Sequence, residues 1–78
     1  MNKKLLIEAI LENHPNKKLG FYEYRFSESK NSYIIWSTNV VSGGFNSCDI
    51  IVALSSVGIS GTLSYSLSNN RVELSIYL

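Results

Sequence analysis

The segment 61–78 places the strongest constraint on the fold, because its alternation and its turn point to one arrangement. Apolar and polar residues alternate on both sides of Asn69-Asn70, a pair that suits a tight turn between two strands. With a two-residue turn, Ser68 lies opposite Arg71 and the register is set from there. The apolar pairs on one side are Leu67 with Val72, Tyr65 with Leu74 and Leu63 with Ile76. The segment is therefore predicted to be a half-buried antiparallel hairpin.

Residues 20–38 predict an earlier hairpin. A strand over 21–27 alternates aromatic and polar residues, residues 28–32 have turn chemistry, and residues 33–37 are aromatic and β-branched. Two registers remain open. A three-residue loop places Phe26 opposite Ile34 and Tyr24 opposite Trp36, whereas a four-residue loop places Phe26 opposite Tyr33 and Tyr24 opposite Ile35.

A helix is predicted over about residues 2–13, because apolar side chains cover most of the helical circumference there. Only Lys4, Glu8 and Glu12 form a narrow polar stripe, so the apolar face is wider than one small sheet can cover. The pair His14-Pro15 ends this helix, since proline disfavours the helical conformation in the residue before it.

A second helix is predicted over about residues 47–57. The β-branched run Ile50-Ile51-Val52 also suits a buried strand, but the apolar residues of the segment fall mostly on one helical face. Asn46 or Ser47 can cap the first turn, and Gly58 can end the helix.

The order helix, hairpin, helix, hairpin predicts an α+β fold in one small domain, residues 1–78. We expect a four-stranded antiparallel sheet with both helices packed on one face. The halves correspond loosely, with Tyr22, Tyr24 and Phe26 matching Leu63, Tyr65 and Leu67. The opposite sheet face is expected to be open and rich in hydroxyls. Its expected residues are Phe21, Glu23, Arg25, Thr62, Ser64, Ser66, Ser68, Ser75 and Tyr77.

Composition excludes several classes of protein. Seven basic and six acidic residues give a net charge of +1, which provides neither the acidic surplus of a DNA mimic nor the basic surplus of a phosphate binder. No apolar run approaches the roughly 20 residues that span a bilayer. The start resembles a secretory signal, but Glu8 and Glu12 interrupt it. One cysteine cannot form an internal disulfide, so we expect a cytoplasmic protein.

Catalytic and metal motifs are weak in this sequence. Cys48 near a helix start and His14 are the only cysteine and histidine, and their spacing does not bring them together. The serines lack a Gly-x-Ser-x-Gly elbow, and too few metal ligands occur at short spacing. Gly43-Gly44 fits neither a P-loop nor a dinucleotide fingerprint. We therefore expect no enzyme, no metal and no cofactor.

Two modes of binding remain. The first is stoichiometric binding to a protein partner, a homodimer, or both, as in a small bacterial or phage inhibitor, immunity or anti-defence protein. The apolar first helix and the nearly uncharged second hairpin indicate association. Aromatic and arginine side chains dominate binding energy at interfaces, which makes Phe21, Arg25, Tyr33 and Tyr77 the expected contacts.

The alternative is binding of single-stranded nucleic acid by the first hairpin. Its aromatic residues resemble a base-stacking platform, and Lys17, Lys18 and Lys30 could meet phosphates. Against it, those aromatics occupy the alternation expected to face the helices, and the basic surplus is missing.

Overall fold

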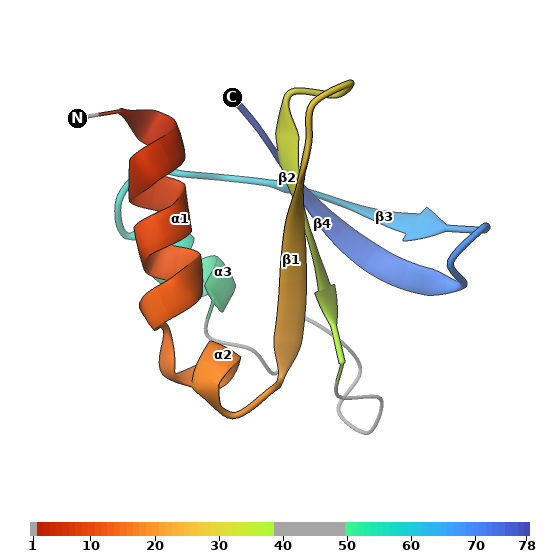
Figure 1. Ribbon diagram of the computed structural model, residues 1–78, viewed down its shortest axis with the longest axis horizontal. Coiled ribbons are helices and arrows are strands. Elements are labelled where there is room, and N and C mark those ends of the chain that lie inside the picture. Colours follow the sequence, from red (N-terminus) through yellow and green to blue (C-terminus); the bar gives the residue numbers. More distant parts are fainter. Residues whose placement is uncertain (1, 39–49) are drawn as a thin grey trace.

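The computed structural model describes residues 2–38 and 50–78 as a four-stranded antiparallel sheet with helices on one side (Figure 1). This confirms the predicted α+β class. The elements are α1 (Lys3–Asn13), α2 (Pro15–Lys18), β1 (Tyr22–Ser27), β2 (Ser32–Ser37), α3 (Ile50–Ser55), β3 (Thr62–Ser66) and β4 (Arg71–Tyr77).

Local chemistry sets both ends of α1. The side chain of Asn2 accepts a hydrogen bond of 2.8 Å from the Lys4 backbone N–H, which caps the first turn. His14 is extended, as expected before proline, and α1 stops there. His14 Nδ1 then accepts from the Asn16 backbone N–H at 3.1 Å and caps α2, a short helix that the sequence analysis does not predict. Pro15 suits the first position of α2 because it needs no N–H there.

The second predicted helix is present as α3, so the strand alternative for residues 50–52 is wrong. Gly58 follows the helix with φ of 78°, and its N–H donates to Ser55 O at 2.9 Å. The Ile59 N–H donates to Leu54 O at 3.0 Å. These two bonds form a Schellman motif, which explains why glycine ends the helix. The predicted first turn at 47–49, Cys48 and Gly43-Gly44 lie outside the described residues.

The strand order is β1-β2-β4-β3, and neighbouring strands are antiparallel. In the first hairpin Phe26 lies opposite Tyr33 and Tyr24 opposite Ile35, which is the register with a four-residue loop. Asn31, the last residue of that loop, has a left-handed φ of 49°. Asparagine tolerates this conformation better than most residues, so it suits the position before the returning strand.

The predicted register of the second hairpin is wrong by two residues. Ser66, not Ser68, lies opposite Arg71, so the loop contains four residues, 67–70. A two-residue type I′ turn needs positive φ at both central residues, whereas of the Asn69-Asn70 pair only Asn70 is left-handed, with φ of 54°. Because the shift is even, each side chain of the strands keeps its predicted face. Leu67 leaves the strand and is 87% exposed.

The two hairpins have the same register when one is shifted by 39 residues. The last pair of the first hairpin, Ser27 with Ser32, corresponds to Ser66 with Arg71 in the second (66 − 27 = 39 and 71 − 32 = 39). The predicted correspondence between the halves is therefore displaced by two residues. Strands β2 and β4 join the halves at the centre of the sheet. The sheet thus has approximate twofold symmetry.

The hydrophobic core lies between the helices and strands β1, β2 and β4. Its fully or nearly buried residues are Ile7, Leu11, Tyr22, Tyr33, Ile35, Ile50, Leu54, Ile59, Leu74 and Ile76. Strand β3 contributes no buried residue. In Figure 1 the turn of the β3–β4 hairpin points away from α1, α2 and α3, so this end of the sheet extends beyond the helical layer.

Candidate interaction surfaces

The polar stripe of α1 faces the sheet. The Tyr24 hydroxyl donates to Glu12 Oε2 at 2.6 Å, and the Tyr33 hydroxyl donates to Glu8 Oε1. Lys4 Nζ lies 4.3 Å from the centre of the Phe26 ring. These contacts cover the aromatic side of the first hairpin, and Tyr33 is only 1% exposed. The polar stripe therefore lies against the first hairpin beside the buried Ile7 and Leu11, with Glu12 still exposed.

Burial and these hydrogen bonds change the acidity of both phenols. Desolvation, followed by the hydrogen bond to Glu12 and the nearby negative charges, raises the pKa of Tyr24 to about 12. Desolvation, followed by the hydrogen bond to Glu8, also raises the pKa of Tyr33. Both phenols therefore stay neutral and can donate throughout the physiological pH range.

The matching side of the second hairpin is about half exposed. A shift of 39 residues relates Tyr24, Phe26 and Tyr33 to Leu63, Tyr65 and Val72. These three residues, which we call the hairpin patch, are 49%, 54% and 44% exposed. Among the described residues, the helix of the second half is Ile50–Ser55, whereas the helix of the first half is Lys3–Asn13. The hairpin patch is therefore an apolar, helix-facing surface without a helix over it among the described residues.

An apolar cavity of about 150 Å³ adjoins the hairpin patch. Its lining residues are Ile51, Leu54, Ser55, Ile59, Ser60, Gly61, Leu63 and Leu74. Leu63 belongs to both the cavity and the patch. The 39-residue shift relates Gly61 to Tyr22, which is fully buried, so the second half has no side chain where the first half has a tyrosine ring.

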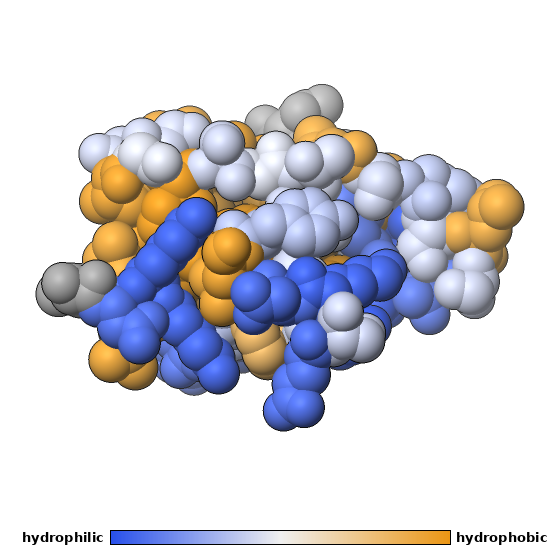
Figure 2. Space-filling model, turned by 90° about the horizontal axis from the view of Figure 1, so that it is seen from above, coloured by the Kyte–Doolittle hydropathy of each residue, from blue (hydrophilic) through white to orange (hydrophobic). Residues whose placement is uncertain are grey.

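A second apolar surface lies on α1. Leu5 is 61% exposed, Ala9 is exposed, and Leu6 and Ile10 are half-buried. These four residues, which we call the α1 outer face, are uncharged and centre on Ala9, which lies opposite the buried Ile7 and Leu11 on the helix. Figure 2 shows hydrophobic side chains reaching the surface at both ends of the long axis, where Figure 1 places α1 and the β3–β4 turn.

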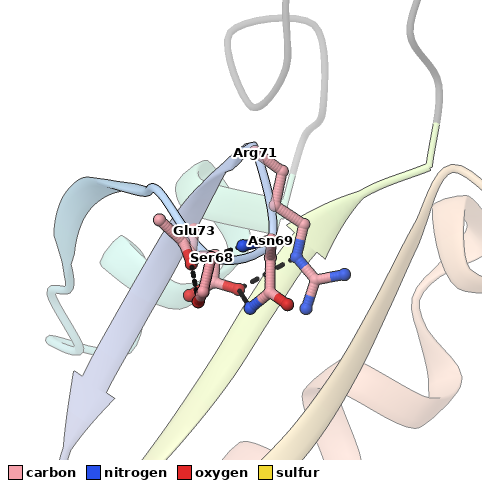
Figure 3. A network of polar contacts seen from close by, with 5 residues as sticks. Ser68, Asn69, Arg71 and Glu73 are labelled. Atoms are coloured by element: carbon pink, nitrogen blue, oxygen red, sulfur yellow. Dashed lines mark hydrogen bonds and ion pairs between the residues drawn. The ribbon is translucent and has the colours of Figure 1, made fainter.

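A polar network lies on the sheet face opposite the helices, where β4 begins. Arg71 Nε donates to Glu73 Oε2 at 2.9 Å, and Asn69 Nδ2 donates to the same oxygen at 3.2 Å (Figure 3). The Arg71 guanidinium also lies 4.0 Å from the centre of the Trp36 ring. Glu73 is therefore paired, and Trp36 is partly shielded by Arg71.

This face is less polar than the sequence analysis predicts. Ile34 lies on it and is only 3% exposed, with Arg25 and Ser75 opposite it on the neighbouring strands. Trp36 is half-buried on the same face. The face is therefore built around two large apolar side chains in β2, and each residue that β3 places on it carries a hydroxyl.

The expected protein contacts do not form one surface. Arg25 and Tyr77 are exposed on the face opposite the helices, but β2 separates the strands that carry them. Phe21 is partly buried and packs against the core. Tyr33 lies under α1 and is buried, so in this structure it is a core residue and not a surface contact. The Tyr33 ring is apolar and its hydroxyl donates a hydrogen bond to Glu8, so the whole side chain can be buried without an unpaired polar group.

The lysines proposed for nucleic-acid contacts are also dispersed. Lys17 and Lys18 lie in α2, before β1, whereas Lys30 lies in the loop after β1. Lys17 is 3.5 Å from the Glu23 carboxylate, which partly neutralises it. The six residues of β1 separate the two positions by roughly 20 Å.

Residues 2–38 and 50–78 contain no helix long and apolar enough to cross a bilayer. Within the same residues, no group of three or more histidine, cysteine or acidic side chains is placed to hold a metal ion. No protein-family model, no curated protein and no solved structure matches the chain.

The sequence patterns described above predict neither the hairpin patch nor the contact of the polar stripe with the sheet. A signal for the stripe was present, because buried tyrosines need hydrogen-bond partners and Glu8 and Glu12 recur at helical spacing. The patch depends on which part of the sheet the helices cover. This does not follow from the alternation in residues 62–77.

Proposed function

We propose that the chain is a small non-enzymatic protein-interaction module that binds a protein partner stoichiometrically through the hairpin patch. The observation that carries this proposal is the exposure of Leu63, Tyr65 and Val72 beside an apolar cavity. Apolar side chains gain about 25 cal/mol per Å² of surface removed from water. A partner that covers the patch therefore gains free energy that the chain itself leaves unused.

The strand beside the patch adds to its capacity for binding. β3 is an edge strand, and none of the residues Thr62–Ser66 is charged. Charged side chains and proline are the usual protection of an edge strand against pairing with another chain. We infer that binding occludes a surface of the partner, which is the mode of inhibitor, immunity or phage anti-defence proteins.

Affinity capture from a bacterial lysate, followed by a measurement of stoichiometry, tests the proposal. Val72→Lys places a charge in the hairpin patch, whereas Leu19→Lys changes a residue that is 66% exposed after α2 and serves as the matched control. We expect the unchanged chain and Leu19→Lys to retain one partner at a fixed ratio and Val72→Lys to lose it. Equal capture by all three forms would contradict the proposal.

The single-stranded nucleic-acid alternative has no comparable observation in its favour. Tyr22 is fully buried, and α1 covers Tyr24 and Phe26, so the expected base-stacking residues are occupied by contacts within the chain. Stacking on aromatic rings supplies much of the affinity in such proteins.

A further inference from the structure

The internal repeat relates the hairpin patch to a surface that a helix covers in the first half. In the first half, an α-helix lies over Tyr24, Phe26 and Tyr33. The residues related to them by the 39-residue shift form the hairpin patch, which has the same strand register and the same facing side. The hairpin patch therefore occupies the position in the second hairpin that α1 covers in the first.

The chain also carries an exposed helical surface of matching chemistry. The α1 outer face presents Leu5, Leu6, Ala9 and Ile10, and Leu5 is 61% exposed. The hairpin patch and the strand beside it are uncharged as well. Contact between these uncharged side chains buries no unpaired charge, because the neighbouring Glu8 and Glu12 already accept hydrogen bonds from Tyr33 and Tyr24.

We propose that a second copy of the chain occupies the hairpin patch with its α1 outer face. This inference rests on the proposed function, because it names the partner of the same patch. The contact joins two different surfaces, so a chain that has lost one surface can still bind through the other. Pairing of identical surfaces, patch with patch or helix with helix, does not have this property.

Complementation between two variants tests the inference. Leu5→Lys places a charge in the α1 outer face, and Val72→Lys places a charge in the hairpin patch. Sedimentation velocity over a range of concentrations gives the mass of each form. We expect the unchanged chain and Leu19→Lys to associate, and each of the two variants alone to associate at least about tenfold more weakly. An equimolar mixture of Leu5→Lys and Val72→Lys contains one intact contact, so we expect a 1:1 heterodimer that grows no further.

Several outcomes overturn the inference. One is a chain that stays monomeric at every concentration. Another is a mixture of the two variants that stays monomeric while the unchanged chain associates, which would indicate pairing of identical surfaces. Circular dichroism and urea unfolding establish that each variant is folded, and Leu5→Gln and Val72→Thr replace any variant that is not. If the chain is monomeric but captures a different protein, and Val72→Lys abolishes that capture, self-association is refuted. The proposed function is then still supported.

Discussion

Ile35 and Leu74 lie directly opposite each other where β2 meets β4, and the 39-residue shift that relates the two hairpins carries one residue onto the other. Both side chains are almost fully buried. The approximate twofold axis of the sheet therefore passes through this pair, and each residue anchors one half of the chain to the other.

Substitution at this pair is expected to weaken both halves together. Ile35→Ala or Leu74→Ala should lower the free energy of unfolding by about 2–5 kcal/mol, because each leaves a cavity in the core. The double variant should show a coupling energy of about 0.5–3 kcal/mol, since the two residues are in adjacent positions. Urea unfolding measures all three values. Val52→Ala, at a residue that is 68% exposed, is the control and should change stability by less than about 0.5 kcal/mol.

The raised pKa of Tyr24 predicts a loss of stability in alkali. The folded state holds the phenol proton up to a pKa of about 12, whereas the ordinary tyrosine pKa is 10.0. The stabilising contribution of the neutral phenol is therefore complete below pH 10 and is lost as the pH rises from 10 to 12. Urea unfolding across this range should show stability falling with pH. The slope should be smaller in Tyr24→Phe, and an unchanged slope would contradict the assignment.

Arg71 is expected to control the environment of Trp36, the single tryptophan of the chain. Arg71→Ala removes the stacked guanidinium and should lower stability by about 0.5–1 kcal/mol through the lost cation–π contact. The tryptophan emission should shift to longer wavelength because water reaches the ring. Arg25→Ala, on the same face but exposed, should leave the emission unchanged. Emission that does not respond to Arg71→Ala would show that the stack is absent in solution.

Gly61 is expected to tolerate no side chain. A Cβ atom at this position would lie 2.7 Å from Leu74 Cδ1 and 2.9 Å from the Ser75 backbone oxygen. Gly61→Ala should therefore destabilise the chain by about 1–3 kcal/mol through overpacking, as thermal or urea unfolding can measure. Ser60→Ala, at the exposed neighbouring residue, is the control. A stability equal to that of the unchanged chain would mean that β4 moves away at little cost.

Most of the fold could be predicted from periodicity. The alternation in residues 62–77 placed each strand residue on its observed face even though the turn was assigned wrongly, because a shift of two residues preserves the faces. The loop length could not be predicted, since it depends on which asparagine adopts the left-handed conformation. For the same reason, the sequence leaves two possible registers for the first hairpin.

The candidate surfaces could be predicted only in part. The broad apolar arc of α1 and the lack of charge in β3 both indicated association. Tyr33 was expected at an interface, but its burial depends on Glu8 accepting its hydrogen bond from across the core. The exposure of Leu63 and Val72 depends on how the chain packs over the second hairpin, which is a property of the tertiary structure.

The central position of the seam between β2 and β4 has a consequence for the order of folding. Each hairpin closes a loop of four residues, whereas Ile35 and Leu74 are 39 positions apart (74 − 35 = 39), so joining them costs more loop-closure entropy. Local hairpins form on a timescale of about 1–10 μs. We expect the hairpins to form early and the contact between β2 and β4 to form in the rate-limiting step, so that Ile35→Ala and changes that weaken the hairpin loops both mainly slow folding.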